Sequence, residues 1–103
     1  MQYRQGDVFI ERTKDKVTGK PVPRDAQGRV VLAYGEVTGH AHAIYGAQVL
    51  MFRDDALART FLTVKEKAEL VHEEHDTIVI EPGDYEIIHQ REYRPEEIRR
   101  VAD

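Results

Sequence analysis

Glycine and proline divide this chain into short apolar segments, and this division is the strongest constraint on what it can fold into. The longest uninterrupted apolar run is Val30 to Tyr34. A run of this length suits a β-strand, which typically needs about five or six residues. It is far shorter than the roughly 20 apolar residues with which a helix crosses a membrane. We therefore expect a mainly β protein without a membrane span.

The clearest predicted strand follows a turn at Pro82-Gly83-Asp84. Proline presets φ in such a turn, and glycine supplies a positive φ. Residues 85–93 then place Tyr85 and Ile87 on one face of a strand, because side chains alternate between the two faces. Further strands are expected at residues 8–10, 30–34, 41–45, 48–52 and 77–80.

Residues 56–75 are compatible with two secondary structures. Apolar side chains recur there at spacings of three and four, as on an amphipathic helix; this stripe consists of Leu57, Phe61, Val64, Ala68 and Val71. The threonines and valines of the same segment favour strands instead. In that case a turn at residues 65–67 would join two strands in a hairpin. The residue pattern leaves both alternatives open.

The expected fold is a small antiparallel β-barrel or sandwich, formed as a single domain by residues 1–103. Residues 13–29 are polar and rich in proline and glycine, so they are predicted to form one long loop. A short helix is predicted to start near Pro95, because two acidic residues follow this proline. The alternative is an α+β domain with a helix within residues 56–75.

Composition narrows the chemistry that the chain can perform. Cysteine and serine are both absent, which excludes disulfides, thiolate metal ligands and serine or cysteine nucleophiles. The net charge of −4 argues against a general phosphate-binding surface. An arginine-rich end leaves a local nucleic-acid contact open; it contains Arg91, Arg94, Arg99 and Arg100. The beginning of the chain lacks the apolar stretch of a secretory signal, so a cytoplasmic location is expected.

Two histidine motifs are the most distinctive chemical feature: GHAH at residues 39–42 and HEEH at residues 72–75. On a strand, the two histidines of GHAH would point to the same face, about 7 Å apart at Cα. The histidines of HEEH are three residues apart and can converge on a helix face or in a turn. Neutral imidazole is a good ligand for transition metals. We predict a site for Zn, Fe, Ni or Mn with the ligands His40, His42, His72 and His75.

Glu73 and Glu74 are the candidate general bases of such a site; the alternatives are that they ligate the metal or accept a hydrogen bond from an imidazole N–H. HEEH differs from the HExxH motif of zinc peptidases in its spacing, so that mechanism does not carry over. A simpler explanation is also open, in which both motifs are polar turns with hydrogen-bonded histidines. His89 lies among apolar residues and is expected to be a partly buried, hydrogen-bonded histidine.

The motifs GEVTGHAH (35–42), HEEH (72–75), PGDY (82–85) and QREY (90–93) together resemble a small family of bacterial and phage-associated proteins of unknown function. The resemblance covers most of residues 30–103. It implies a β protein with HEEH at the end of a strand and PGDY as a hairpin turn. It therefore favours strands over a helix within residues 56–75.

His40 and His42 also resemble the His-x-His motif of cupins, which are small β-barrels. In cupins a glutamate follows this motif at a short distance, and a later histidine follows the Pro-Gly turn. Here no such glutamate follows His42, and HEEH precedes Pro82-Gly83. No cupin activity is carried over.

Two classes of function therefore remain open. The first is a metal-binding domain with hydrolase or oxygen-using activity. The second is a non-catalytic module, either a homo-oligomer or an accessory protein that docks a protein partner through a sheet edge or the 13–29 loop. A nucleic-acid accessory role rests only on the arginine-rich end and on the phage association that the resemblance implies.

Overall fold

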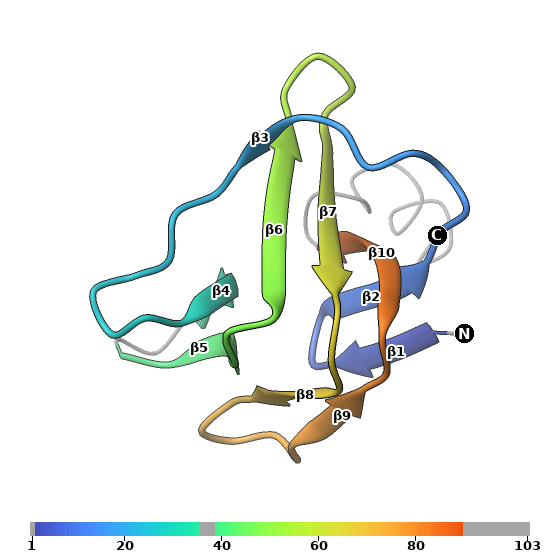
Figure 1. Ribbon diagram of the computed structural model, residues 1–103. Coiled ribbons are helices and arrows are strands. Elements are labelled where there is room, and N and C mark those ends of the chain that lie inside the picture. Colours follow the sequence, from blue (N-terminus) through green and yellow to red (C-terminus); the bar gives the residue numbers. More distant parts are fainter. Residues whose placement is uncertain (1, 36–38, 90–103) are drawn as a thin grey trace, which may run out of the picture.

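The computed structural model describes residues 2–35 and 39–89, and every helix or strand position in this part of the chain is a β-strand. The strands form two sheets with antiparallel pairing throughout (Figure 1). The six-stranded sheet has the spatial order β1 (Gln2–Gln5), β2 (Val8–Arg12), β10 (Gly83–His89), β7 (Arg59–Val64), β6 (Val49–Asp54) and β3 (Lys20–Pro21). The four-stranded sheet has the order β4 (Val30–Tyr34), β5 (Ala41–Tyr45), β8 (Ala68–Val71) and β9 (Ile78–Ile80). No helix of the described residues is long and apolar enough to cross a membrane.

The chain passes repeatedly from one sheet to the other: β3 leads to β4, β5 to β6, β7 to β8, and β9 to β10. In Figure 1, β6 and β7 rise as a long hairpin, whereas β4, β5, β8 and β9 lie across its lower end. Within the described residues both sheets stay open, with β1 and β3 as the edges of the larger and β4 and β9 as the edges of the smaller. The mainly β fold is thus confirmed as a sandwich-like packing of two sheets, and not as a closed barrel.

Inward-facing side chains from both sheets form the apolar core between them. The four-stranded sheet supplies Leu32, Ile44, Leu70 and Ile80, and the six-stranded sheet supplies Val8, Ile10, Leu62, Tyr85 and Ile87. The central strand β7 is covered on both faces, since Phe61 and Leu62 are both fully buried. Tyr85 is buried with its hydroxyl donating to the carbonyl of Glu81 at 2.6 Å, so its polar group is satisfied inside the core.

The helix considered for residues 56–75 is wrong, because this segment forms β7 and β8. Phe61 and Val64 of the helical stripe are buried, but they lie on β7, whereas Ala68 lies on β8 in the other sheet. Leu57 starts the stripe and is exposed in the turn before β7. The alternative hairpin is wrong in one respect: residues 65–67 separate strands of different sheets, which do not pair with each other. Ladders to β6 and β10 on its two sides hold β7 in the extended state.

Most predicted strands are confirmed with small changes of boundary. The strand predicted at 48–52 runs on to Asp54, and the one predicted at 77–80 begins at Ile78. Apart from the two residues of β3, residues 13–29 form the expected loop. Strand β1 was not predicted, because its sequence QYRQ is polar. Residues 90–93 of the last predicted strand and the helix near Pro95 lie outside the described residues.

Leu70 and Leu57 distinguish the two-sheet fold from the helical alternative. Leu70 is 0% exposed on β8, whereas Leu57 is 55% exposed. We expect Leu70→Ala to lower the free energy of unfolding by about 2–5 kcal/mol, the usual cost of truncating a buried leucine. Leu57→Ala should change it by less than about 0.5 kcal/mol. Urea unfolding followed by circular dichroism measures both, and the reverse ranking would contradict this fold, because Leu57 and not Leu70 lies on the helical stripe.

Candidate metal centre

The pairing of β5 with β8 brings the two histidine motifs together. Their register pairs Ile44 with Leu70, and two steps further along the antiparallel strands His42 comes opposite His72. Because side chains two residues apart share a face, both histidines continue inward-facing apolar rows. Both are buried, and the centroids of their imidazole rings lie 4.3 Å apart. The motifs therefore meet at one end of the apolar core.

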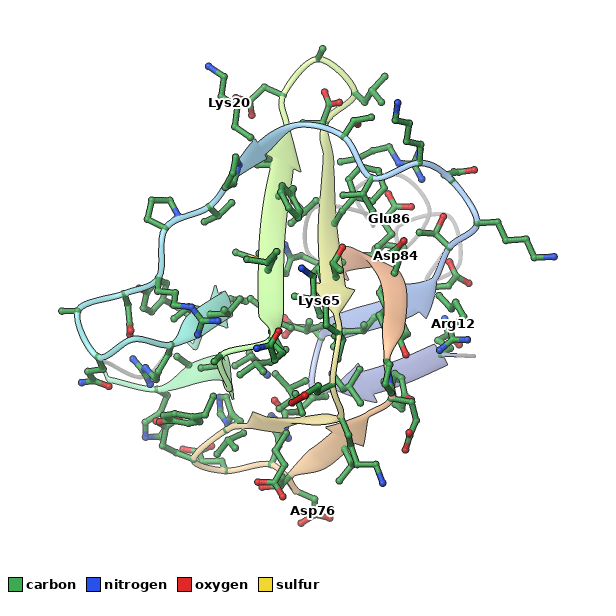
Figure 2. The ribbon with its side chains drawn as sticks, viewed as in Figure 1. Arg12, Lys20, Lys65, Asp76, Asp84 and Glu86 are labelled. Atoms are coloured by element: carbon green, nitrogen blue, oxygen red, sulfur yellow. The ribbon has the colours of Figure 1, made fainter. Side chains whose placement is uncertain are left out.

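All four histidines that were predicted as ligands lie in this cluster. Ring centroids are separated by 4.6 Å for His72 and His75, and by 5.7 Å both for His40 and His72 and for His42 and His75. His40 is half-buried and His75 is exposed. The cluster thus runs from the core to the surface, near the loop that joins β8 to β9. Figure 2 marks this loop by Asp76, whose side chain points away from the sheets.

Three side chains of the cluster approach one another closely enough to share a metal ion. One ligand atom each from His40, His72 and Glu73 lies within 4.8 Å of the other two. His42 and His75 are ring neighbours of this group without belonging to it. The structure therefore places Glu73, predicted as a general base with ligation as an alternative, among the potential ligands.

Two glycines make room for the imidazole rings. Gly6, in the turn between β1 and β2, has a φ of 60°. A Cβ atom at this position would lie 3.0 Å from Nε2 of His75 and 3.2 Å from Cε1 of His42. A Cβ atom on Gly35 would lie 3.0 Å from Cβ of His40. Since side chains rarely pack this closely, a larger residue at either glycine would displace a ring of the cluster.

A buried glutamine at the end of β1, Gln5, holds His42. Oε1 of Gln5 lies 2.8 Å from Nδ1 of His42. Nε2 of the same amide donates to the carbonyl oxygens of Leu70 at 3.1 Å and Asp76 at 2.9 Å. Gln5 therefore connects the six-stranded sheet to both histidine-bearing segments of the smaller sheet.

Glu74 contacts two histidines in opposite ways. Its carboxylate Oε2 lies 3.2 Å from Nδ1 of His40. An ionised carboxylate only accepts hydrogen bonds, so the neutral His40 ring carries its proton on Nδ1 and its lone pair on Nε2. The backbone N–H of Glu74 donates to Nδ1 of His72 at 3.0 Å. The neutral His72 ring therefore carries its proton on Nε2.

Glu73 has a carboxylate that hydrogen bonds keep ionised. Its Oε1 accepts a hydrogen bond from the backbone N–H of Ala41 at 3.0 Å. This bond and one from its own backbone N–H lower the pKa of Glu73, helped by the nearby His40 and His72. A carboxylate with a lowered pKa is available as a metal ligand at neutral pH. It is also a weaker base, so ligation is favoured over the predicted role in proton transfer.

Sequence reasoning missed Gln5, because nothing in the polar sequence of β1 marks one of its glutamines as buried. His89 is hydrogen-bonded as predicted: its Nε2 donates to the carbonyl of Leu32 at 2.8 Å. The acceptor lies at a bulge, where the register between β4 and β5 shifts between Val31 and Ala33. His89 thus satisfies a backbone group at an irregularity of the smaller sheet.

Fold and site together define a two-sheet antiparallel β domain with a histidine and glutamate cluster at one end of its core. The chain belongs to the family of a domain of unknown function, DUF8820, which matches residues 4–90. This range includes both histidine motifs and Gln5. The expected membership of a family without an assigned function is thereby confirmed. No characterised protein and no solved structure matches the chain significantly.

His42 makes the stability of the metal-free protein depend on pH. Burial, and then the nearby His72 and His75, lower the pKa of His42 from 6.5 to about 4. Between these values the unfolded chain binds more protons at this residue than the folded protein does. Stability is therefore complete above pH 6.5 and falls as the pH is lowered towards 4, by at most about 3 kcal/mol from this residue.

Urea unfolding in the presence of a chelator, at pH values above 6.5 and near 4, measures this loss. His42→Asn is the matched control, because its amide can still donate to Gln5 but does not titrate. We expect a smaller loss of stability in this variant than in the wild type. An equal loss in both proteins would show that His42 is not the group responsible.

Proposed function

We propose that the protein binds one divalent transition-metal ion through His40, His72 and Glu73. The observation that supports this most directly is the approach of their three ligand atoms to within 4.8 Å of one another. These residues come from two loops that the β5–β8 pairing holds side by side. Two imidazoles and one carboxylate are a donor set found in zinc hydrolases and in non-haem iron oxygenases.

The donor types favour Zn, Fe, Ni or Mn over Ca and Mg, which prefer shells of oxygen atoms. Three protein ligands leave a coordination position for water or a substrate, as catalytic sites require. His42 and His75 line the same cluster and are candidates for a further ligand or for contacts to a bound molecule. His75 is exposed, so solvent reaches this end of the cluster.

The hydrogen bonds around the cluster are compatible with metal ligation by His40 but compete with metal ligation by His72. A ligand nitrogen needs a free lone pair, which the neutral His40 ring has on Nε2, with Glu74 orienting the ring through Nδ1. In His72 the lone pair is on Nδ1 and is used by the N–H of Glu74. Coordination through Nδ1 displaces that N–H, and coordination through Nε2 moves the ring proton to Nδ1. Either route breaks the hydrogen bond between Glu74 and His72.

Removal of the Glu73 charge tests the ligand set. We expect untagged protein to bind about one Zn²⁺ per chain, and Glu73→Gln to weaken binding by more than about tenfold. The glutamine keeps an oxygen that accepts from the backbone of Ala41, so the local fold is retained. Competition with a coloured chelator measures the affinity.

Glu69→Gln is the matched control, because Glu69 is exposed on β8 and outside the cluster. It removes the same charge from the same region and should leave affinity unchanged. Equal weakening in both variants would point to a general charge effect and against ligation by Glu73. Wild-type protein without bound metal would reject the proposal and favour the non-catalytic module, whose oligomeric state or partner would then be the question.

The loop between β8 and β9 should respond to metal more than β5 does. Because ligation by His72 breaks its hydrogen bond with the N–H of Glu74, we expect the amide resonance of Glu74 to move on addition of Zn²⁺ and its hydrogen exchange to accelerate. The amide of Ile44, within the β5–β8 ladder, serves as the internal control. An unchanged Glu74 amide in the metal-loaded protein would exclude His72 as a ligand.

A further inference from the structure

We infer that Gln5 is a positioning residue of the histidine cluster: it holds His42 in the tautomer that is protonated on Nδ1 and carries its lone pair on Nε2. Only the effect of this arrangement on metal binding rests on the proposed function. The tautomer itself is a property of the metal-free protein.

The orientation of the Gln5 amide follows from its acceptors. One end of the amide faces the carbonyl oxygens of Leu70 and Asp76, at 3.1 and 2.9 Å. A carbonyl oxygen can only accept, so this end must be the NH₂ group, and both of its hydrogens are used. The other end is therefore the amide oxygen, which lies 2.8 Å from Nδ1 of His42.

The tautomer of His42 then follows from the amide. An amide oxygen cannot donate a hydrogen bond, so Nδ1 of His42 must carry the proton. In the neutral ring the lone pair is left on Nε2, the nitrogen with which histidine can bind a metal or accept from a bound molecule. His42 is 4% exposed, and its imidazole lies next to the rings of His72 and His75. A hydrogen bond from Nδ1 to a fixed acceptor is the usual way in which proteins orient ligating histidines.

Gln5 also differs from a residue that only fills space. It is buried at the end of β1 in the six-stranded sheet, whereas the three hydrogen-bond partners of its side chain belong to β5, β8 or the loop after β8. Gln5 therefore fixes His42 relative to the loop that carries His72 and His75. A purely structural role would require these bonds but would not depend on which nitrogen of His42 is protonated.

Two substitutions at Gln5 separate these roles. Gln5→Met removes every hydrogen bond while roughly keeping the volume. Gln5→Glu keeps an oxygen acceptor for His42 whether or not the carboxyl is ionised, but gives up at least one of the two N–H bonds to backbone carbonyls. Both variants are expected to lose stability. Only Gln5→Met should lose the tautomer.

Nitrogen-15 spectra of the histidine rings report the protonated nitrogen directly. The resonances of the His42 ring are assigned by their absence in His42→Asn. In the metal-free wild type, at a pH above the pKa of free histidine, we expect these resonances to show that Nδ1 carries the proton. Gln5→Glu should retain this form and Gln5→Met should shift towards protonation on Nε2. Protonation on Nε2 in the wild type would overturn the inference, and that measurement requires no variant of Gln5 to fold.

Zinc affinity then shows whether the tautomer matters to the site. With His42 as the further ligand of the proposed site, we expect Gln5→Met to weaken Zn²⁺ binding by about 10–100-fold, the usual effect of losing the hydrogen-bond partner of a ligating histidine, and Gln5→Glu to restore most of the affinity. Gln2→Met, on the exposed end of the same strand, is the matched control. Unchanged affinity in a Gln5→Met protein with an altered tautomer would refute the positioning role. Absence of zinc binding in the wild type would reject the proposed function and leave the tautomer result intact.

Discussion

The antiparallel pairing of β5 with β8 is the interaction on which the rest of the site depends. Burial of Ile44 and Leu70 on the inner face of the smaller sheet sets the register, because a slip of one residue between the strands would turn one of these side chains towards solvent. The same register carries His42 and His72 to the end of that inner face. Apolar packing between the two strands thus positions the polar cluster.

Short apolar segments between glycine and proline were enough to predict the mainly β fold and most strand positions. They did not predict which strands share a sheet, because four connections between consecutive strands of the described residues lead from one sheet to the other. The false helical stripe in residues 56–75 has the same origin. Phe61 and Val64 are buried on opposite faces of β7, and Ala68 is buried on the other sheet. Burial on two faces and in two sheets therefore reproduces a helical spacing by coincidence. Strand β1 was missed because its sequence is polar and only Gln5 among its four residues is buried.

The histidine cluster was predictable in its members but not in its internal order. The motifs GHAH and HEEH contain all four histidines of the cluster, and the spacing within each motif shows which side chains can share a face. The grouping of His40 and His72 with Glu73 depends on the register across two strands, which no spacing within either motif contains. Gln5 lies far from both motifs in the sequence. Its role arises only when the two sheets pack and its amide meets two carbonyl oxygens and an imidazole.

The location of Gln5 on β1 has a consequence for the dynamics of the domain. Within its sheet β1 is an edge strand that pairs only with β2. Edge strands can separate from a sheet at a lower free-energy cost than global unfolding. Detachment of β1 would withdraw the amide from His42 while the β5–β8 ladder stayed intact, so the ring would lose its fixed tautomer in an otherwise folded protein. The first few residues of the chain therefore control the state of a cluster whose histidines all lie more than thirty positions later.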